Sequence, residues 1–162
     1  MPHSRYLPVT HSPFSKLHMD TLEISPPSHQ GFRYVLVIVD DFSRFNHIFL
    51  MTKKVRKNIV LCHFVNEVKN KLGITPGYIH TDHGEQGSTH YPQTNGVAEH
   101  FNQTLLVKIQ CLLAQSNITI SYWDKAALHA SLLLNCLPHQ YLQTMFFSNV
   151  MQLLNQPLNL VK

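Results

Sequence analysis

Cysteine is scarce in this sequence, since only Cys62, Cys111 and Cys136 occur in 162 residues. The number is odd and no Cys-x-x-Cys pair is present, which argues against a disulfide framework and against a cysteine-ligated zinc site. All three lie in apolar patterns of helical spacing, and free cysteines are commonly buried. We therefore expect three buried thiols in a reducing compartment.

The sequence also lacks a long apolar run. No stretch approaches the roughly 20 apolar residues that a membrane helix needs. Residues 1–8, Met-Pro-His-Ser-Arg-Tyr-Leu-Pro, contain no apolar signal core. Both absences favour an intracellular protein.

Size and composition indicate one folded domain. A chain of 162 residues can bury a substantial core, and a hydrophobic fraction of 44% is typical of globular proteins. The formal net charge is +4. This mild basic excess permits nucleic-acid binding without requiring it.

The first third of the chain predicts an antiparallel meander of three strands. Residues 1–15 hold three prolines and no periodic pattern, so we interpret them as an irregular lead-in. The strands are recognised by apolar–polar alternation or by a continuous β-branched run, with Asp40 and Asp41 as turn residues before the third. The expected strands are residues 16–24, 32–39 and 45–51.

The remainder predicts helices around one more strand. A strand that follows a helical crossover can lie parallel to the first strand. The expected elements are a helix capped by Asn58 and ending at Leu72, a strand at 78–81, a helix from Asn95-Gly96 to Ala114, a helix at 121–137, and a tail at 140–162 with one apolar run at 145–154. The expected buried faces are Ile59, Cys62, Val65, Val68 and Leu72 on the first helix, and Trp123, Ala126, Ala127, Ala130, Leu133, Leu134 and Leu137 on the last. The predicted core domain spans residues 16–139.

Three acids lie where these elements can bring them together. Asp82 ends the fourth expected strand, Glu99 lies in the first turn of the next helix, and Asp20 lies within the first strand. Hard divalent cations such as Mg²⁺ prefer carboxylate oxygens and keep positions open for phosphate and water. The pattern therefore predicts a magnesium site.

Five segments carry a resemblance to a known family. They are Leu-His-Met-Asp-Thr-Leu at 17–22, Tyr-Val-Leu-Val-Ile-Val-Asp-Asp-Phe-Ser-Arg at 34–44, His-Thr-Asp-His-Gly at 80–84, Pro-Gln-Thr-Asn-Gly-Val-Ala-Glu at 92–99 and Trp-Asp-Lys-Ala at 123–126. In this order they resemble the catalytic core of retroviral-type integrases, with wording closest to copia-type LTR retrotransposons. The resemblance implies a ribonuclease-H-like α/β fold, with a mixed sheet flanked by helices. It also implies a polynucleotidyl transferase that trims and joins DNA ends with two Mg²⁺ or Mn²⁺ ions.

The resemblance assigns roles residue by residue. Asp20, Asp82 and Glu99 would be the catalytic, metal-binding triad. The partners would be mobile-element DNA ends and a target duplex, with RNA left open, and the protein would act in the nucleus as a multimer. The predicted nucleic-acid contacts are Gln93, Thr94 and Asn95 in a loop beside the site, Lys108 on the Glu99 helix, and the basic cluster Lys53, Lys54, Arg56 and Lys57, for which a solvated helix entrance is the alternative.

One spacing departs from the family. Only 17 positions separate Asp82 from Glu99, whereas the family normally has about a helix and a strand more between these acids. This implies an internally shortened copy without an edge strand. No His-His-Cys-Cys module precedes the predicted core and no basic domain follows it. Two functions stay open: an active integrase core, and a retrotransposon remnant that folds and at most binds nucleic acid.

Overall fold

The computed structural model describes residues 12–54, 57–81 and 96–137. These residues form four strands and three α-helices, in the predicted order, with one 3-10 turn between the last two helices. In the described part of the chain, no helix has the length and apolar character needed to cross a membrane. The elements are β1 Lys16–Glu23, β2 Tyr34–Asp40, β3 Asn46–Met51, α1 Lys57–Leu72, β4 Tyr78–Thr81, α2 Gly96–Ser116, η2 Ile120–Tyr122 and α3 Trp123–Cys136.

The four strands form one mixed sheet in the order β3-β2-β1-β4. The first three strands pair antiparallel, and β4 pairs parallel with β1. The meander and the parallel fourth strand are thus confirmed. The central strand β2 is buried from Val35 to Asp40, as expected for a β-branched run covered on both faces.

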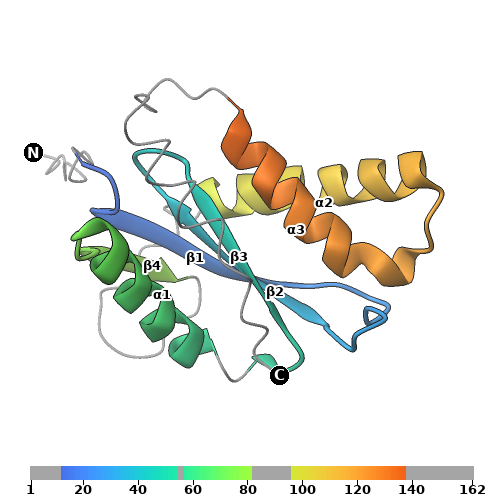
Figure 1. The fold of residues 1–162 in the computed structure, drawn as a ribbon, viewed down its shortest axis with the longest axis horizontal. Helices are drawn as coiled ribbons and strands as arrows, with labels where there is room; N and C mark the ends of the chain where they lie inside the picture. The colour runs from blue at the N-terminus through green and yellow to red at the C-terminus, as the bar shows by residue number, and fades with distance from the viewer. Residues whose placement is uncertain (1–11, 55–56, 82–95, 138–162) are drawn as a thin grey trace, which may run out of the picture.

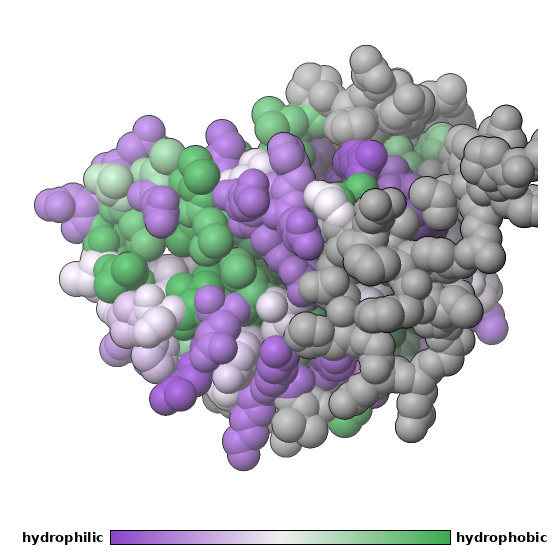
Figure 2. Space-filling view, turned by 180° about the vertical axis from the view of Figure 1, so that it is seen from behind, coloured by the Kyte–Doolittle hydropathy of each residue, from purple (hydrophilic) through white to green (hydrophobic). Residues whose placement is uncertain are grey.

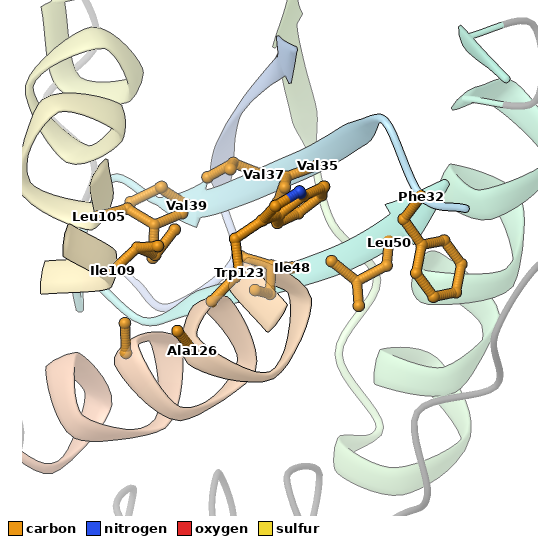
Figure 3. Close-up of a cluster of buried hydrophobic side chains, with 12 residues drawn as sticks. Phe32, Val35, Val37, Val39, Ile48, Leu50, Leu105, Ile109, Trp123 and Ala126 are labelled. Carbon is orange, nitrogen blue, oxygen red and sulfur yellow. The ribbon is translucent and has the colours of Figure 1, made fainter. Parts of the chain in front are cut away.

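Two hydrophobic clusters fill the two faces of the sheet. Helix α1 covers one face, while α2 and α3 cover the other (Figure 1). Phe64 and Val68 of α1 contribute to the first cluster. Trp123 lies in the second, between α3 and the sheet (Figure 3), and its indole N–H donates to the carbonyl of Pro26 at 3.0 Å. Because both faces are covered, side-chain alternation along each strand decides which helix layer a residue meets.

Asp40 organises the turn from β2 to β3, as predicted. Its Oδ1 accepts from the Phe14 N–H at 3.0 Å, and its Oδ2 accepts from the Ser43 N–H and hydroxyl at 2.9 and 2.6 Å. Burial raises the pKa of the Asp40 carboxyl, and these hydrogen bonds oppose that rise. Arg44 completes the turn at a φ of 60°.

A buried polar cluster joins β3 to α3, and the sequence analysis did not foresee it. Asn135 Oδ1 accepts from the Asn46 backbone N–H and side-chain amide at 2.9 and 2.7 Å. The Asn135 amide donates to the Asn46 carbonyl at 2.8 Å, and the Ser131 hydroxyl donates to Asn46 Oδ1 at 2.6 Å. These bonds fix where the end of α3 lies against the edge strand.

The expected buried face of α1 was right in its second half, where Val68 is buried and Leu72 packs against the cluster, and wrong in its first half. The buried residues are Val60, Phe64 and Val68, whereas Ile59 is 67% exposed. In that first half the expected face lies one position before the buried one, and one position rotates a helix face by about 100°. The helix already includes Lys57, so Asn58 lies inside the helix and does not cap it.

The expected burial of the cysteines was also wrong. Cys62, Cys111 and Cys136 are all exposed, because the buried stripe of each helix passes through neighbouring positions. On α3 the stripe ends on Ser131 and Asn135, which leaves Leu133 and Leu137 41% and 54% exposed. The remaining predicted members of the α3 face lie in or against the cluster.

Part of the surface is apolar. Around the connection between α2 and α3, Ile118, Ile120 and Tyr122 are 49%, 56% and 41% exposed. The Tyr122 ring stacks on the His29 ring at a centroid distance of 5.3 Å. Hydrophobic residues also gather on the side of the molecule seen from behind (Figure 2).

Candidate active site

Asp20 lies in the middle of β1 and faces the layer of α2 and α3. Its neighbour Met19 belongs to the cluster under α1, so alternation turns Asp20 to the opposite face. The carboxylate is half-buried and accepts two hydrogen bonds. Oδ1 accepts from the Thr21 N–H at 2.7 Å, and Oδ2 accepts from the Asn102 side-chain amide at 2.6 Å. One predicted ligand is therefore held at a defined place beside α2.

The first two turns of α2 carry the second acid. Glu99 lies in the first turn and is exposed. Asn102 follows three residues later and is only 7% exposed. Residues three apart are neighbours on a helix surface, so the contact between Asn102 and Asp20 brings the Glu99 end of α2 next to β1. The structure thus associates two of the three predicted acids with one region.

The third acid lies outside the described residues. The parallel register of β1 and β4 ends with Met19 opposite Thr81, and Asp82 is the next residue in the sequence. The predicted loop contacts Gln93, Thr94 and Asn95 also lie outside the described residues, as does Arg56 of the basic cluster.

The carboxylates of Asp20 and Glu99 are the kind of ligand that a hard cation prefers, although these two residues alone do not form a complete metal site. Asp20 and Glu99 offer carboxylate oxygens, which Mg²⁺ and Mn²⁺ prefer over sulfur. Within residues 12–54, 57–81 and 96–137, no three His, Cys, Asp or Glu side chains are grouped closely enough to hold a metal ion. The third carboxylate of the predicted set, Asp82, lies outside these ranges.

A histidine pair lies on the same face of the sheet, two positions before Asp20. His18 is 1% exposed, and its Nε2 lies 3.1 Å from Asp41 Oδ1. The His18 ring packs edge-on against the His80 ring of β4 at a centroid distance of 5.8 Å. Burial is the main factor that lowers the pKa of His18, with a smaller contribution from Lys16, while Asp41 acts in the opposite direction. The sequence does contain a signal for this pair. His18 lies two positions before Asp20 in a strand, so the two side chains point to the same face. This signal was not used in the sequence analysis.

The predicted basic contacts that the structure describes lie on separate elements and do not gather around Asp20. Lys53 and Lys54 are exposed and follow β3, at the edge of the sheet opposite β4. Lys57 begins α1, which covers the other face. Lys108 is exposed on α2, nine residues after Glu99. Their contact with nucleic acid stays a prediction.

A cavity of about 640 Å³ lies beside the first turns of α2, between the β2–β3 turn and the end of α3. Its walls are mainly apolar and include Val97, Phe101 and Leu134, with Arg44 and His100 as basic residues. Neither Asp20 nor Glu99 is part of its lining, so the candidate metal site lies outside this cavity.

Comparisons with known proteins agree with this architecture. The family model described as integrase core domain matches residues 10–126. The chain is 24% identical over 148 residues to the retrovirus-related Pol polyprotein from transposon RE1 of Arabidopsis thaliana, covering 81% of this chain and 10% of that protein. It is 27% identical over 127 residues to the corresponding polyprotein from transposon TNT 1-94 of Nicotiana tabacum, covering 67% of this chain and 10% of that protein.

A solved structure shares the fold. A chain in the simian T-cell lymphotropic virus intasome in complex with the PP2A regulatory subunit B56 gamma aligns at a TM-score of 0.60 and 18% identity. The alignment covers 90% of this chain and 55% of that chain. The present chain spans only about a tenth of the curated polyproteins it matches. Since the family model covers well over half of its residues, the chain belongs to the integrase core domain family.

Proposed function

We propose that this chain is the catalytic core of a copia-type retrotransposon integrase, which cleaves and joins DNA ends with divalent metal ions. The observation that carries the proposal is the contact of Asp20 on β1 with α2, one turn after Glu99. Asp20, Asp82 and Glu99 would hold two Mg²⁺ or Mn²⁺ ions. Such ions, when bound, activate the attacking oxygen and neutralise charge on the leaving oxygen.

The register of the sheet supports the inclusion of Asp82. His18 and His80 are paired across β1 and β4 and their rings are in contact. Because strand side chains alternate, the next residue of this face is Asp20 on β1 and would be Asp82 on an extended β4. The third carboxylate would then enter the site beside the first. The role of this chain would be to hold three carboxylates close together while one side stays open to DNA.

The other parts of the proposal follow from the family. The named relatives are Pol polyproteins of transposons, which favours mobile-element DNA ends and a target duplex as substrates. The proposed catalytic core spans residues 16–139. It would act in the nucleus, and its active form would be a multimer. Lys53, Lys54 and Lys108 are exposed and would contact backbone phosphates, which carry most of the non-specific affinity for DNA.

The direct test is a strand-transfer assay with labelled DNA ends. The purified chain should yield joined products with Mg²⁺ or Mn²⁺ and none with a chelator present. Asp20→Asn removes a charge while preserving the size of the side chain, so its products should fall to the no-enzyme background. Lys69→Gln, an exposed charge change on α1, should keep the wild-type yield.

The short interval of 17 positions between Asp82 and Glu99 favours a second candidate, a remnant without catalysis. If the chain is such a remnant, the wild type and the Asp20→Asn variant should both yield strand-transfer products only at the no-enzyme background. It would still shift the fluorescence anisotropy of a labelled duplex, and added salt would abolish that shift. Metal-dependent products that vanish in Asp20→Asn would exclude this second candidate.

A further inference from the structure

Asn102 is an unusual residue for its place on α2. The side of the helix that faces the sheet buries Ala98, Leu105 and Ile109, and Asn102 is the polar residue among them. Its Nδ2 donates to Asp20 Oδ2 at 2.6 Å, whereas its Oδ1 is buried and has no hydrogen-bond partner among the described residues. Burying an amide with only part of its hydrogen bonds is costly compared with burying an apolar side chain. Core packing alone would therefore favour leucine at this position.

The orientation of the amide is fixed by charge. With Nδ2 towards Asp20, an N–H donates to a carboxylate, which is a strong type of hydrogen bond. The reverse orientation would bring the amide oxygen against the carboxylate and would be repulsive. The Asn102 side chain thus holds one oxygen of Asp20, and the Thr21 N–H holds the other.

This bond joins the two elements that carry the described acids. Asp20 lies on β1, and Glu99 lies three residues before Asn102 on α2. We infer that Asn102 is a positioning residue, which orients the Asp20 carboxylate towards the Glu99 end of α2 so that both can serve one metal site. The inference depends on the proposed function, because it assumes that Asp20 binds metal.

The test measures Mn²⁺ binding to the whole chain by electron paramagnetic resonance, which needs no catalytic turnover. Asn102→Leu removes the donor at a similar volume, and loss of such a supporting contact should weaken Mn²⁺ affinity about tenfold. The matched control is Leu105→Val, one turn along the same buried side of α2. It should lower the unfolding temperature and leave Mn²⁺ affinity unchanged. If Asn102→Leu does not fold, Asn102→Ala replaces it.

Three outcomes are distinct. Weakened binding in the Asn102 variant, with wild-type affinity in Leu105→Val, supports the positioning role. Equal Mn²⁺ affinity in wild type and the Asn102 variant, with binding abolished by Asp20→Asn, overturns the positioning role and leaves the proposed function intact. A wild-type chain that binds no Mn²⁺ at millimolar concentrations overturns both.

Discussion

His47 should make the protein lose stability as the pH falls below neutral. This side chain lies on β3, is 7% exposed, and packs against the rings of Phe49 and Phe64 at centroid distances of 4.6 and 5.4 Å. Its Nδ1 is buried and has no hydrogen-bond partner among the described residues. Burial lowers the pKa of His47 to about 4, because the imidazolium form would lose its hydration.

The size of the effect follows from proton linkage. A histidine in an unfolded chain has a pKa of about 6.5, so the unfolded state takes up a proton at a higher pH than the folded state. The stabilising contribution of neutral His47 is therefore present above pH 6.5 and is lost as the pH falls towards 4. Relative to pH 7, the free energy of unfolding should fall by about 2 kcal/mol at pH 5 and about 3 kcal/mol at pH 4 from this residue.

Urea unfolding at several pH values measures this loss, with the fluorescence of Trp123, the only tryptophan, as the signal. His47→Phe is the matched variant, because it keeps an aromatic ring beside Phe49 and Phe64 and cannot take up a proton. The difference between the two proteins cancels the other titrating groups, including His18 and Asp40. If the free energies of unfolding of the wild type and the His47→Phe variant fall in parallel from pH 7 to pH 4, His47 does not titrate as its burial requires.

Two other changes test the packing. Asn135→Ala should lower the free energy of unfolding by about 3 kcal/mol, because it leaves buried groups of Asn46 unpaired. Asn70→Ala, at an exposed position, should stay within about 0.5 kcal/mol of wild type, and equal losses in both would refute the assignment. Gly77→Ala should cost about 2 kcal/mol by the same urea assay, because the new Cβ would lie 2.9 Å from the Ser15 carbonyl oxygen, and an unchanged midpoint would contradict this.

The positions of the strands could be predicted because apolar–polar alternation and the continuous β-branched run fit strands and no other element. Residues 78–81 were expected as a strand and form β4, and the expected first strand at 16–24 differs from β1 by one residue. The buried face of α1 was not predictable in the same way. Two apolar stripes overlap on that helix, one through Ile59 and one through Val60. The contact of Phe64 with Phe49 of β3, on the face of the sheet that α1 covers, selects the second stripe.

The candidate site was predictable only in its charged residues. Asp20 and Glu99 could be singled out because carboxylates at a strand and at a helix start suggest a metal site. Asn102 could not, because a polar residue three positions after an acid is common on any exposed helix face. Its role becomes visible only through its contact with a residue 82 positions earlier. Asn46 and Asn135 were missed for the same reason, since they are 89 positions apart.

Directional bonds at three places hold the α2 and α3 layer on the sheet and on the connection between β1 and β2. Asn102 joins α2 to Asp20 on β1, Asn135 joins α3 to β3, and the Trp123 indole joins the start of α3 to Pro26. Hydrophobic contact alone is non-directional and would tolerate small shifts of a helix along the sheet. Buried hydrogen bonds do not, because a shift would leave their groups unpaired. Since α2 also packs on α3, the anchors of α3 restrict α2 as well. The placement of Glu99 relative to Asp20 therefore depends on residues at both ends of α3.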